Sequence, residues 1–289
     1  MEKIAFISGE TIYYWSSIVL TLATLTAICF FWSLYLGKGG NGVAAFSVVP
    51  LAIVLSLLLG RLVHWYCRTS SYDSFTSAIK PFSPGGYALL GVFAGCALAA
   101  VIVRLVHFDR NLPQMLDCMA VAGCAGIAVG RLACFFNSAD RGQIIASTQS
   151  LPWVYPVTNA VSGATEYRLA TFILQAMAAL VLFLILLSFY LPKKQRKDGD
   201  TALIFLLFYG ASQIVLDSTR YDKLFFRSNG FVSVVQVLGA LGLLLVIVVF
   251  SLRMVKARGF RFWNVLVWLG IAACIGGAGF MDLAKTVNG

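Results

Sequence analysis

The stretch LATFILQAMAALVLFLILLSFYL, residues 169–191, decides the class of fold. It holds no charged residue, and the basic run KKQRK follows it closely at residues 193–197. A helix needs about 20 mainly apolar residues to cross the hydrocarbon core of a bilayer. The stretch therefore predicts a transmembrane helix that ends at a membrane surface.

The whole chain has the composition of a membrane protein. Of its 289 residues, 60% are hydrophobic and only 12% are charged, and the mean hydropathy is +0.85. Soluble domains are about 25% charged, because polar groups have to cover a folded surface. No polar stretch is long enough to bury a core of its own. We expect a single integral membrane domain over residues 1–289.

Seven further apolar runs flank this stretch and have lengths suited to membrane spans. With it, the runs lie at residues 12–36, 43–66, 86–106, 115–136, 169–191, 201–216, 231–255 and 262–281. The predicted fold is all-α, a polytopic transmembrane helical bundle of seven to eight spans, in which residues 262–281 form the extra eighth span. The run at 201–216 is short and ends in polar residues, so we expect its far end either to be irregular or to lean on the protein interior. The longer segments 68–84 and 137–167 are expected to form outward-facing interfacial arms.

Basic residues indicate how the chain lies in the membrane. The densest clusters are at residues 193–197 and 253–261, and both follow odd-numbered runs. Because cytoplasmic loops are enriched in lysine and arginine, these clusters predict an N-terminus outside the cytoplasm. The net charge of +10 is dispersed among apolar segments. No zinc-finger spacing or aromatic–basic stripe accompanies it, so we expect no nucleic-acid partner.

Charged residues also stand near the ends of three runs, all on the predicted outward side. These residues are Arg61, Arg131, Asp217 and Arg220. A charge in hydrocarbon costs several kcal/mol, so such residues usually face a cavity or a partner. Two simpler readings stay open: each arginine reaches the headgroups along its own stem, or Asp217 and Arg220 form a local ion pair.

Several polar residues accompany these charges and favour a shared polar cavity at the outer interface. They are Asn137, Gly142, Tyr209 and Gln236. The guanidinium group is a forked donor that suits phosphate oxygens and stays charged at every relevant pH. Such a cavity is fitted to an anionic phospholipid headgroup. The seven cysteines form no CxxC pair and lie mostly in apolar runs, so we expect no metal site and buried side chains for all except Cys134, whose role stays open.

The segment GRLACFFNSADRG at residues 130–142 resembles the GRxxNFxNxExxG segment of the prolipoprotein diacylglyceryl transferases. Weaker matches follow the same order along the chain, so that the family-like core covers about residues 12–252. They are Tyr14-Trp15, Gly60-Arg61-Leu62, Gly85-Gly86 with Gly91 and Gly95, Pro152-Trp153 with Pro156, Tyr209-Gly210 with Asp217 and Arg220, and Gln236.

The resemblance implies a multi-pass protein of the bacterial cytoplasmic (inner) membrane that needs no metal or cofactor. The family transfers the diacylglyceryl group of phosphatidylglycerol to the lipobox cysteine thiol of a preprolipoprotein, and glycerol phosphate is released. The implied partners are phosphatidylglycerol, the signal-peptide region of the preprolipoprotein and membrane lipids.

The resemblance also implies roles for individual residues. Arg131 is expected to hold the phosphate and headgroup, and Arg220 and Arg61 to line the cavity. Asn137 and Gly142 are expected to shape the cavity. The expected catalytic set is Arg131, Arg220, Tyr209 and Asp217, and the expected phospholipid-binding set is Arg131, Arg61, Asn137, Gly142 and Gln213.

The chain departs from the family pattern at several positions. Leu90 stands where the family has a histidine, and Gln213 stands where it has an arginine. Substitutes for the proton acceptor are Tyr87, Asp140, Tyr209, Asp217 and His64, and substitutes for the positive charge are Arg141 and Lys223. Two other functions therefore stay open. One is a catalytically altered relative that binds or processes an anionic phospholipid, and the other is a membrane transporter or structural protein.

Overall fold

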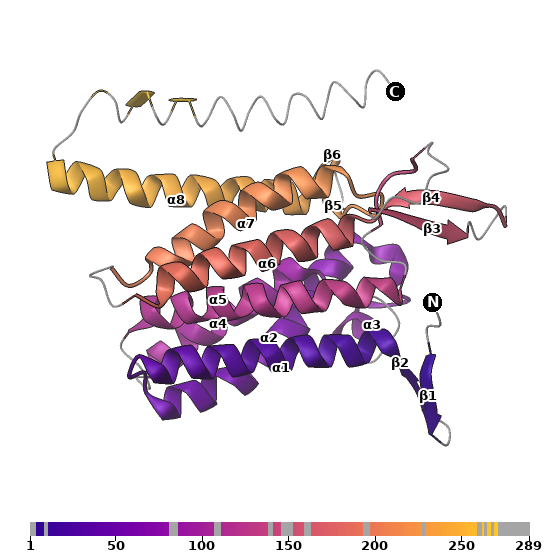
Figure 1. Cartoon of the computed structure of the whole chain (residues 1–289), viewed down its shortest axis with the longest axis horizontal. Coiled ribbons are helices and arrows are strands. Elements are labelled where there is room, and N and C mark those ends of the chain that lie inside the picture. Colours follow the sequence, from indigo (N-terminus) through magenta and orange to yellow (C-terminus); the bar gives the residue numbers. More distant parts are fainter. Residues whose placement is uncertain are drawn as a thin grey trace.

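A computed structural model shows long helices that lie side by side, with short strands gathered at one end (Figure 1). It describes residues 4–258 except for 9–10, 81–85, 107–110, 138–140, 146–152, 159–162, 193–196 and 227–228. Beyond residue 258 it describes only residues 262, 265–266 and 269–270.

The long helices confirm the predicted helical membrane bundle. In the described part of the chain they are α1 (Trp15–Gly37), α2 (Gly42–Cys67), α4 (Leu89–Leu105), α5 (Leu112–Gly130), α6 (Thr171–Tyr190), α7 (Asp200–Ser218) and α8 (Val234–Arg258). All but α4 are long and apolar enough to cross a membrane, and α4 is a shorter apolar helix. The chain is therefore a multi-pass membrane protein. The run at 262–281 lies almost entirely outside the described residues, so the eighth span stays a prediction.

The short elements gather at the end of the bundle where α1 begins and α2 ends (Figure 1). They are η1 (Thr69–Ser71), α3 (Phe75–Ile79), η2 (Arg131–Phe135) and the strands β1 (Ile4–Ser8), β2 (Thr11–Tyr14), β3 (Val154–Thr158), β4 (Thr165–Leu169), β5 (Phe225–Phe226) and β6 (Asn229–Ser233). The strands form three antiparallel pairs, β1–β2, β3–β4 and β5–β6. Two-stranded hairpins thus occur within a fold that was predicted as all-α, and β3 and part of β4 lie in the predicted arm 137–167.

The opposite end of the bundle brings together the end of α1 with that of α6, and the end of α8 with the start of α7. The ammonium group of Lys38 donates to the carbonyl of Tyr190 at 2.7 Å and lies 4.0 Å from the centre of the Tyr190 ring. Arg253 near the end of α8 forms an ion pair with Asp200 at the start of α7. These contacts confirm that the segments after α1, α6 and α8 share one side.

A buried carboxylate joins α5 to the start of α7 at this same end. Asp117 is only 4% exposed, and its oxygens accept hydrogen bonds from the backbone amides of Gly199 at 2.8 Å and Ala202 at 2.7 Å. The first amides of a helix have no partner within it and are usually capped by the residue that precedes the helix. Here the preceding residue is Gly199, with a φ of 95°, and α5 supplies the cap from outside.

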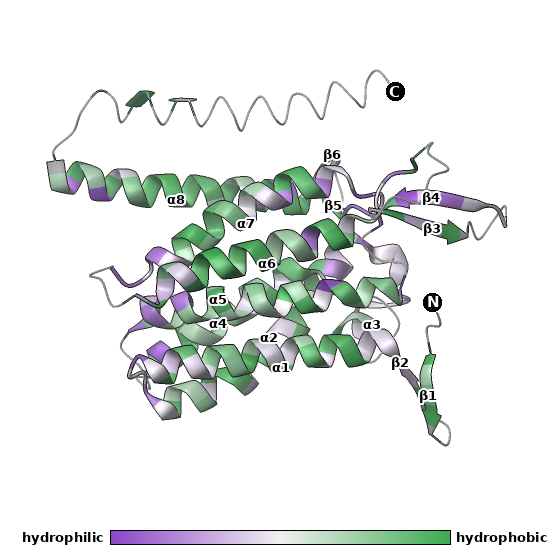
Figure 2. Ribbon diagram, viewed as in Figure 1, coloured by the Kyte–Doolittle hydropathy of each residue, from purple (hydrophilic) through white to green (hydrophobic). Residues whose placement is uncertain are grey.

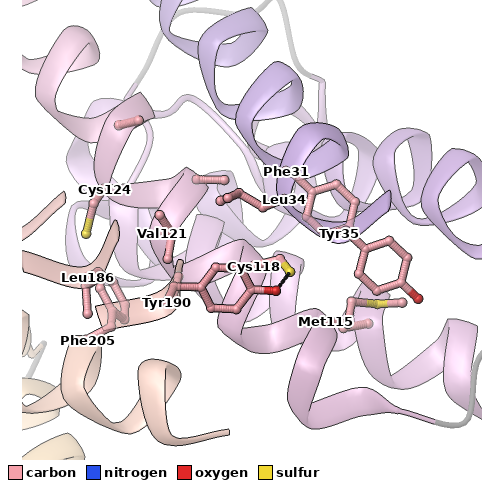
Figure 3. Packing of buried hydrophobic residues seen from close by; sticks show 14 of the residues in the cluster. Phe31, Leu34, Tyr35, Met115, Cys118, Val121, Cys124, Leu186, Tyr190 and Phe205 are labelled. Carbon is pink, nitrogen blue, oxygen red and sulfur yellow. Dashed lines mark hydrogen bonds between the residues drawn. The ribbon is translucent and has the colours of Figure 1, made fainter. Parts of the chain in front are cut away.

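The apolar core is formed by α1, α2, α4, α5, α6 and α7, and Figure 3 shows part of it. Phe31 and Tyr35 of α1 stack at 5.4 Å, and Cys118 of α5 lies 2.9 Å from the hydroxyl of Tyr190. Of the cysteines in the described part of the chain, Cys118 and Cys124 are buried as predicted, and Cys134 is buried as well. Cys67 and Cys96 are partly exposed, and Cys29 is exposed. The middle parts of the helices are mainly hydrophobic, and hydrophilic residues lie mostly toward the two ends of the bundle (Figure 2).

Glycines let α2 and α4 approach so closely that their backbones touch. A Cβ atom added at Gly95 would lie 2.5 Å from the amide nitrogen of Ser56, and one added at Gly91 would overlap the carbonyl of Leu59. The hydroxyl of Ser56 donates to the carbonyl of Val92 at 3.0 Å across the same contact. Small residues at such crossings are characteristic of helices that pack within membranes.

We predict that Gly95→Ala destabilises the protein by about 1–3 kcal/mol, because its methyl group meets backbone atoms that cannot move aside. The matched control is Gly123→Ala in α5, where no atom lies within 4 Å of the added Cβ and alanine favours a helix. Thermal unfolding of the detergent-solubilised variants measures both effects. An equal melting temperature for Gly95→Ala and wild type would contradict the close α2–α4 contact.

Candidate functional site

Arginines from several segments gather where α2, α5 and α7 end, and we call this region the arginine end. Its members are Arg61, Arg68, Arg131, Arg141, Arg168 and Arg220. Hydrogen bonds connect these segments across the end. Arg68 donates to the carbonyl of Asp222 at 3.0 Å, and the amide of Tyr221 donates to the carbonyl of Arg141 at 2.9 Å.

Arg220 lies between two carboxylates. Its guanidinium group is 3.4 Å from Asp217 and 3.1 Å from Asp222, and its side chain is only 11% exposed. Asp217 is fully buried and also accepts a hydrogen bond from the hydroxyl of Ser233. The predicted local ion pair of Asp217 and Arg220 is therefore present. It belongs to a larger network that fixes the direction of the Arg220 side chain.

The same network explains why α7 continues further than expected. The far end of this run was expected either to be irregular or to lean on the protein interior, and α7 stays helical through Asp217 to Ser218 with Asp217 buried inside the protein. Ser233 and Gln236 form a capping box at the start of α8. The Ser233 hydroxyl accepts from the amide of Gln236 at 3.1 Å, and the Gln236 side chain accepts from the amide of Ser233 at 3.2 Å. Because Ser233 also donates to Asp217, polar partners stabilise the end of α7 within the protein.

Residues 141–145 form an extended segment, here called the ribbon, which lies between β4 and the segment after α7. The amide of Gly142 donates to the carbonyl of Leu169 at 2.8 Å, and the amide of Ile145 donates to the carbonyl of Tyr167 at 2.8 Å. On its other side, the amide of Gln143 donates to the carbonyl of Thr219 at 3.1 Å. Gly142 also forms an antiparallel bridge with Arg220. The ribbon thus connects β4 with the segment after α7.

Gly142 has no room for a side chain. An added Cβ atom would lie 2.6 Å from the Cβ of Leu169, 2.7 Å from the hydroxyl of Thr171 and 2.8 Å from the carbonyl of Leu169. These distances are shorter than contacts between real atoms, and two of the neighbours are held by the backbone of β4. The expectation that Gly142 shapes the region therefore has a steric basis.

Aromatic rings hold two arginines here, Arg141 of the ribbon and Arg168 of β4. Arg141 lies 5.0 Å from the ring centre of Tyr155 and donates to the carbonyl of Asn137 at 3.0 Å. Arg168 lies 4.4 Å from the ring centre of Tyr221 and forms an ion pair with Glu166 at 2.8 Å. Burial lowers the pKa of Arg141 from its ordinary value, and the positive charge of Arg168 lowers it further. Arginine remains protonated even so.

Arg61 and Arg68 join the end of α2 to neighbouring segments. Arg61 is only 1% exposed, and it donates to the carbonyl oxygens of Ser77 at 3.1 Å and Ala78 at 3.2 Å. Its guanidinium group also lies 5.0 Å from the ring centre of Tyr72. Arg61 therefore holds α3, and Tyr72 directly after η1, against α2. Its expected role in binding a phospholipid stays a prediction.

The other predicted site residues lie around this network. Arg131 is half-buried where α5 passes into η2, and Asn137 follows η2. Gln213 is buried on α7. Tyr209 is also buried there, where it stacks on Phe205 at 5.1 Å and meets Phe93 edge-on at 5.3 Å. This aromatic surrounding favours packing as the role of Tyr209, and its predicted role in catalysis stays untested.

Reasoning from the sequence missed several residues that lie at or beside the arginine end. Ser233 completes the environment of Asp217, and the pattern Ser-Val-Val-Gln at residues 233–236 is the signal for a capping box. Arg168 and Tyr221 form a pair, but they lie far apart in the sequence and belong to no motif. Only the fold brings them together.

We predict that Gly142→Ala opens the ribbon, because the added methyl group forces it away from β4. Amide exchange of residues 141–145 should become at least ten times faster, which corresponds to about 1.4 kcal/mol of lost protection. Hydrogen–deuterium exchange with mass spectrometry measures this change. The matched control is Gly130→Ala in the same motif, where an added Cβ meets its nearest neighbour at an ordinary 3.5 Å. Unchanged exchange in Gly142→Ala would contradict the steric argument.

Comparison with known proteins is consistent with this arrangement. Residues 3–252 match the sequence model of the family described as prolipoprotein diacylglyceryl transferase. Curated relatives include the phosphatidylglycerol–prolipoprotein diacylglyceryl transferases of Streptococcus pyogenes serotypes M3 and M5. Each is 22% identical over 266 residues, which cover 91% of this chain and 99% of the relative. Because the match spans most of the chain, this protein belongs to the prolipoprotein diacylglyceryl transferase family.

Proposed function

We propose that this protein transfers the diacylglyceryl group of phosphatidylglycerol to the lipobox cysteine thiol of a preprolipoprotein. The observation that carries the proposal is the joining of two motif segments at the arginine end. Residues 130–142 and 209–220 are distant in the sequence, yet Gly142 forms a bridge with Arg220. The curated relatives carry names that state the same two substrates.

The reaction places two demands on the protein. The thiol gives up its proton, the sulfur forms a bond with the glyceryl carbon, and the bond from that carbon to the phosphate oxygen breaks. The electron pair leaves with the oxygen of glycerol phosphate. A proton acceptor is needed near the sulfur, and fixed positive charge is needed near the departing phosphate.

The arginine end suits the second demand. Arginines outnumber carboxylates in the contacts described above, and their positions are held by backbone carbonyls, aromatic rings and carboxylates. Groups that are fixed before the reaction stabilise developing charge without rearrangement. We assign Arg131 to the phosphate, and Arg61 and Arg220 to the lining of the cavity. Asn137, Gly142 and Gln213 shape the headgroup site, while Asp217 orients Arg220.

The proposed location is the bacterial cytoplasmic membrane, with the N-terminus outside the cytoplasm. Basic residues at the end opposite to the arginine end, including Lys38 and Arg253, are expected to face the cytoplasm. The arginine end then faces outward, where the lipobox of an exported preprolipoprotein is accessible.

A second candidate is a catalytically altered relative that binds an anionic phospholipid without transferring it. One observation favours it: two carboxylates, Asp217 and Asp222, pair with Arg220 and reduce the charge that this arginine offers to a phosphate. Such a protein would retain phosphatidylglycerol on purification but modify no thiol.

We predict that Arg131→Ala lowers the transfer rate about 30-fold to a thousandfold, since the loss of a charge-assisted contact to the phosphate costs about 2–4 kcal/mol. Purified protein in phosphatidylglycerol-containing nanodiscs and a lipobox peptide provide the assay, with mass spectrometry of the peptide as the readout. Complementation of cells depleted of their own transferase provides the test in vivo.

The matched control for this prediction is Arg104→Ala. It removes an exposed arginine in the last turn of α4, away from the arginine end, and should leave the rate unchanged. A well-folded wild-type protein that modifies no peptide, yet copurifies with phosphatidylglycerol, would support the second candidate. Equal rates for wild type and Arg131→Ala would contradict the role of Arg131 in holding the phosphate.

A further inference from the structure

We propose that His64 accepts the thiol proton in the transfer reaction, through its Nε2 atom. This inference rests on the proposed function and names the group that meets its first demand. The chain has two histidines, His64 and His107, and His107 lies outside the described residues. His64 lies in the last turn of α2, one turn after Arg61 and one turn before Arg68.

Two hydrogen bonds determine which nitrogen of His64 carries the proton. The hydroxyl of Tyr72 donates to the carbonyl of Gly86 at 2.9 Å, and the Nδ1 atom of His64 lies 2.9 Å from the same hydroxyl oxygen. The single hydroxyl proton of Tyr72 points to Gly86, because a carbonyl oxygen can only accept. The bond between His64 and Tyr72 therefore uses a proton on Nδ1. In a neutral imidazole this leaves Nε2 as the proton acceptor.

The surroundings of Nε2 leave this atom available. The ring is half-buried, and within the described part of the chain no residue forms a hydrogen bond with Nε2. Gly86 lies directly beside it, since an added Cβ at this glycine would be 2.6 Å from Nε2. Any side chain at this position would collide with Nε2, so the glycine keeps the nitrogen from being covered by a side chain at residue 86.

Contacts connect His64 to the rest of the arginine end. The amide of Arg68 donates to the carbonyl of His64 at 2.8 Å, and the side chain of Arg68 donates to the carbonyl of Asp222 at 3.0 Å. Asp222 in turn forms an ion pair with Arg220 at 3.1 Å. His64, the proposed base, is thus connected to Arg220 through Arg68 and Asp222.

The other titratable groups near the ring are less suited to take a proton. Arg61 and Arg68 of α2 are cations, and Tyr72 already uses its hydroxyl proton to fix the ring. The carboxylates of Asp217 and Asp222 lie against Arg220, and a carboxylate paired with arginine is a weak base. The positive charge of Arg61 and Arg68 also stabilises the thiolate that forms when the proton leaves.

The proposed step is balanced in atoms and charge. Nε2 takes the thiol proton, the thiolate forms the carbon–sulfur bond, and the carbon–oxygen bond to the phosphate breaks with its electron pair on oxygen. The imidazolium then returns the proton to the phosphate group of the released glycerol phosphate. His64 is neutral again at the end of one turnover.

The decisive variant is His64→Asn, whose side-chain amide can donate to Tyr72 as Nδ1 does but offers no basic nitrogen in place of Nε2. We expect kcat to fall about 10²–10⁴-fold with little change in KM for phosphatidylglycerol. The decline in the wild-type rate at acidic pH should disappear in this variant. Added imidazole should restore part of the rate to His64→Ala.

The matched control is His107→Asn, which should retain the wild-type rate. If His64→Asn keeps a rate within threefold of wild type, His64 is only structural and the inference is overturned. An inactive wild-type protein would instead refute the proposed function, so the two failures are distinct. Thermal unfolding identifies a variant that does not fold.

A measurement on the wild-type protein does not depend on whether a His64 variant folds. Nitrogen NMR of protein labelled at histidine distinguishes a protonated from an unprotonated ring nitrogen, and the spectrum of His107→Asn assigns the signals. We expect protonated Nδ1 and unprotonated Nε2 in neutral His64, and Tyr72→Phe should remove this preference. A neutral ring with its proton on Nε2 would contradict the proposal.

Discussion

The hydrogen bonds of the ribbon at residues 141–145 hold the ends of several membrane helices together. Backbone groups that leave a helix near hydrocarbon need partners inside the protein, because lipid offers none. The ribbon meets this requirement with the carbonyls of Leu169 and Thr219. Gly142 makes the approach possible, and the bridge between Gly142 and Arg220 follows from it. The ribbon thus adds to the packing of α5 against α7 a direct link between the segments that follow these two helices.

The guanidinium groups of the arginine end are held by several kinds of partner. Arg220 has carboxylates, Arg61 has backbone carbonyls and the ring of Tyr72, and Arg141 has a carbonyl and the ring of Tyr155. Carbonyls and rings hold a guanidinium group in position but do not neutralise its charge. Arg61 and Arg141 are thus held without a carboxylate in these contacts, whereas Arg220 is oriented by its acidic neighbours.

Much of this arrangement could be predicted from residue types and spacing. Apolar length predicted the spanning helices, and Arg61, Asp217 and Arg220 were assigned to one end because each stands where a run stops. The pairs made by the fold could not be predicted. Arg168 meets Tyr221, and Ser233 meets Asp217, only because hairpins and helix ends converge there. The polar residues at the end of the run at 201–216 left open whether this end is irregular or leans on the protein interior. The partners that favour the second outcome, Ser233 and Arg220 on Asp217, could not be identified from the sequence pattern.

The carboxylate of Asp117 has a consequence for the way the protein is made. Its partners, the amides of Gly199 and Ala202, are synthesised well after α5 has left the ribosome. A nascent chain that stops before α7 therefore carries an acidic group in a spanning helix without its partners. The late arrival of α7 therefore both completes the bundle and supplies the hydrogen bonds that this buried carboxylate needs.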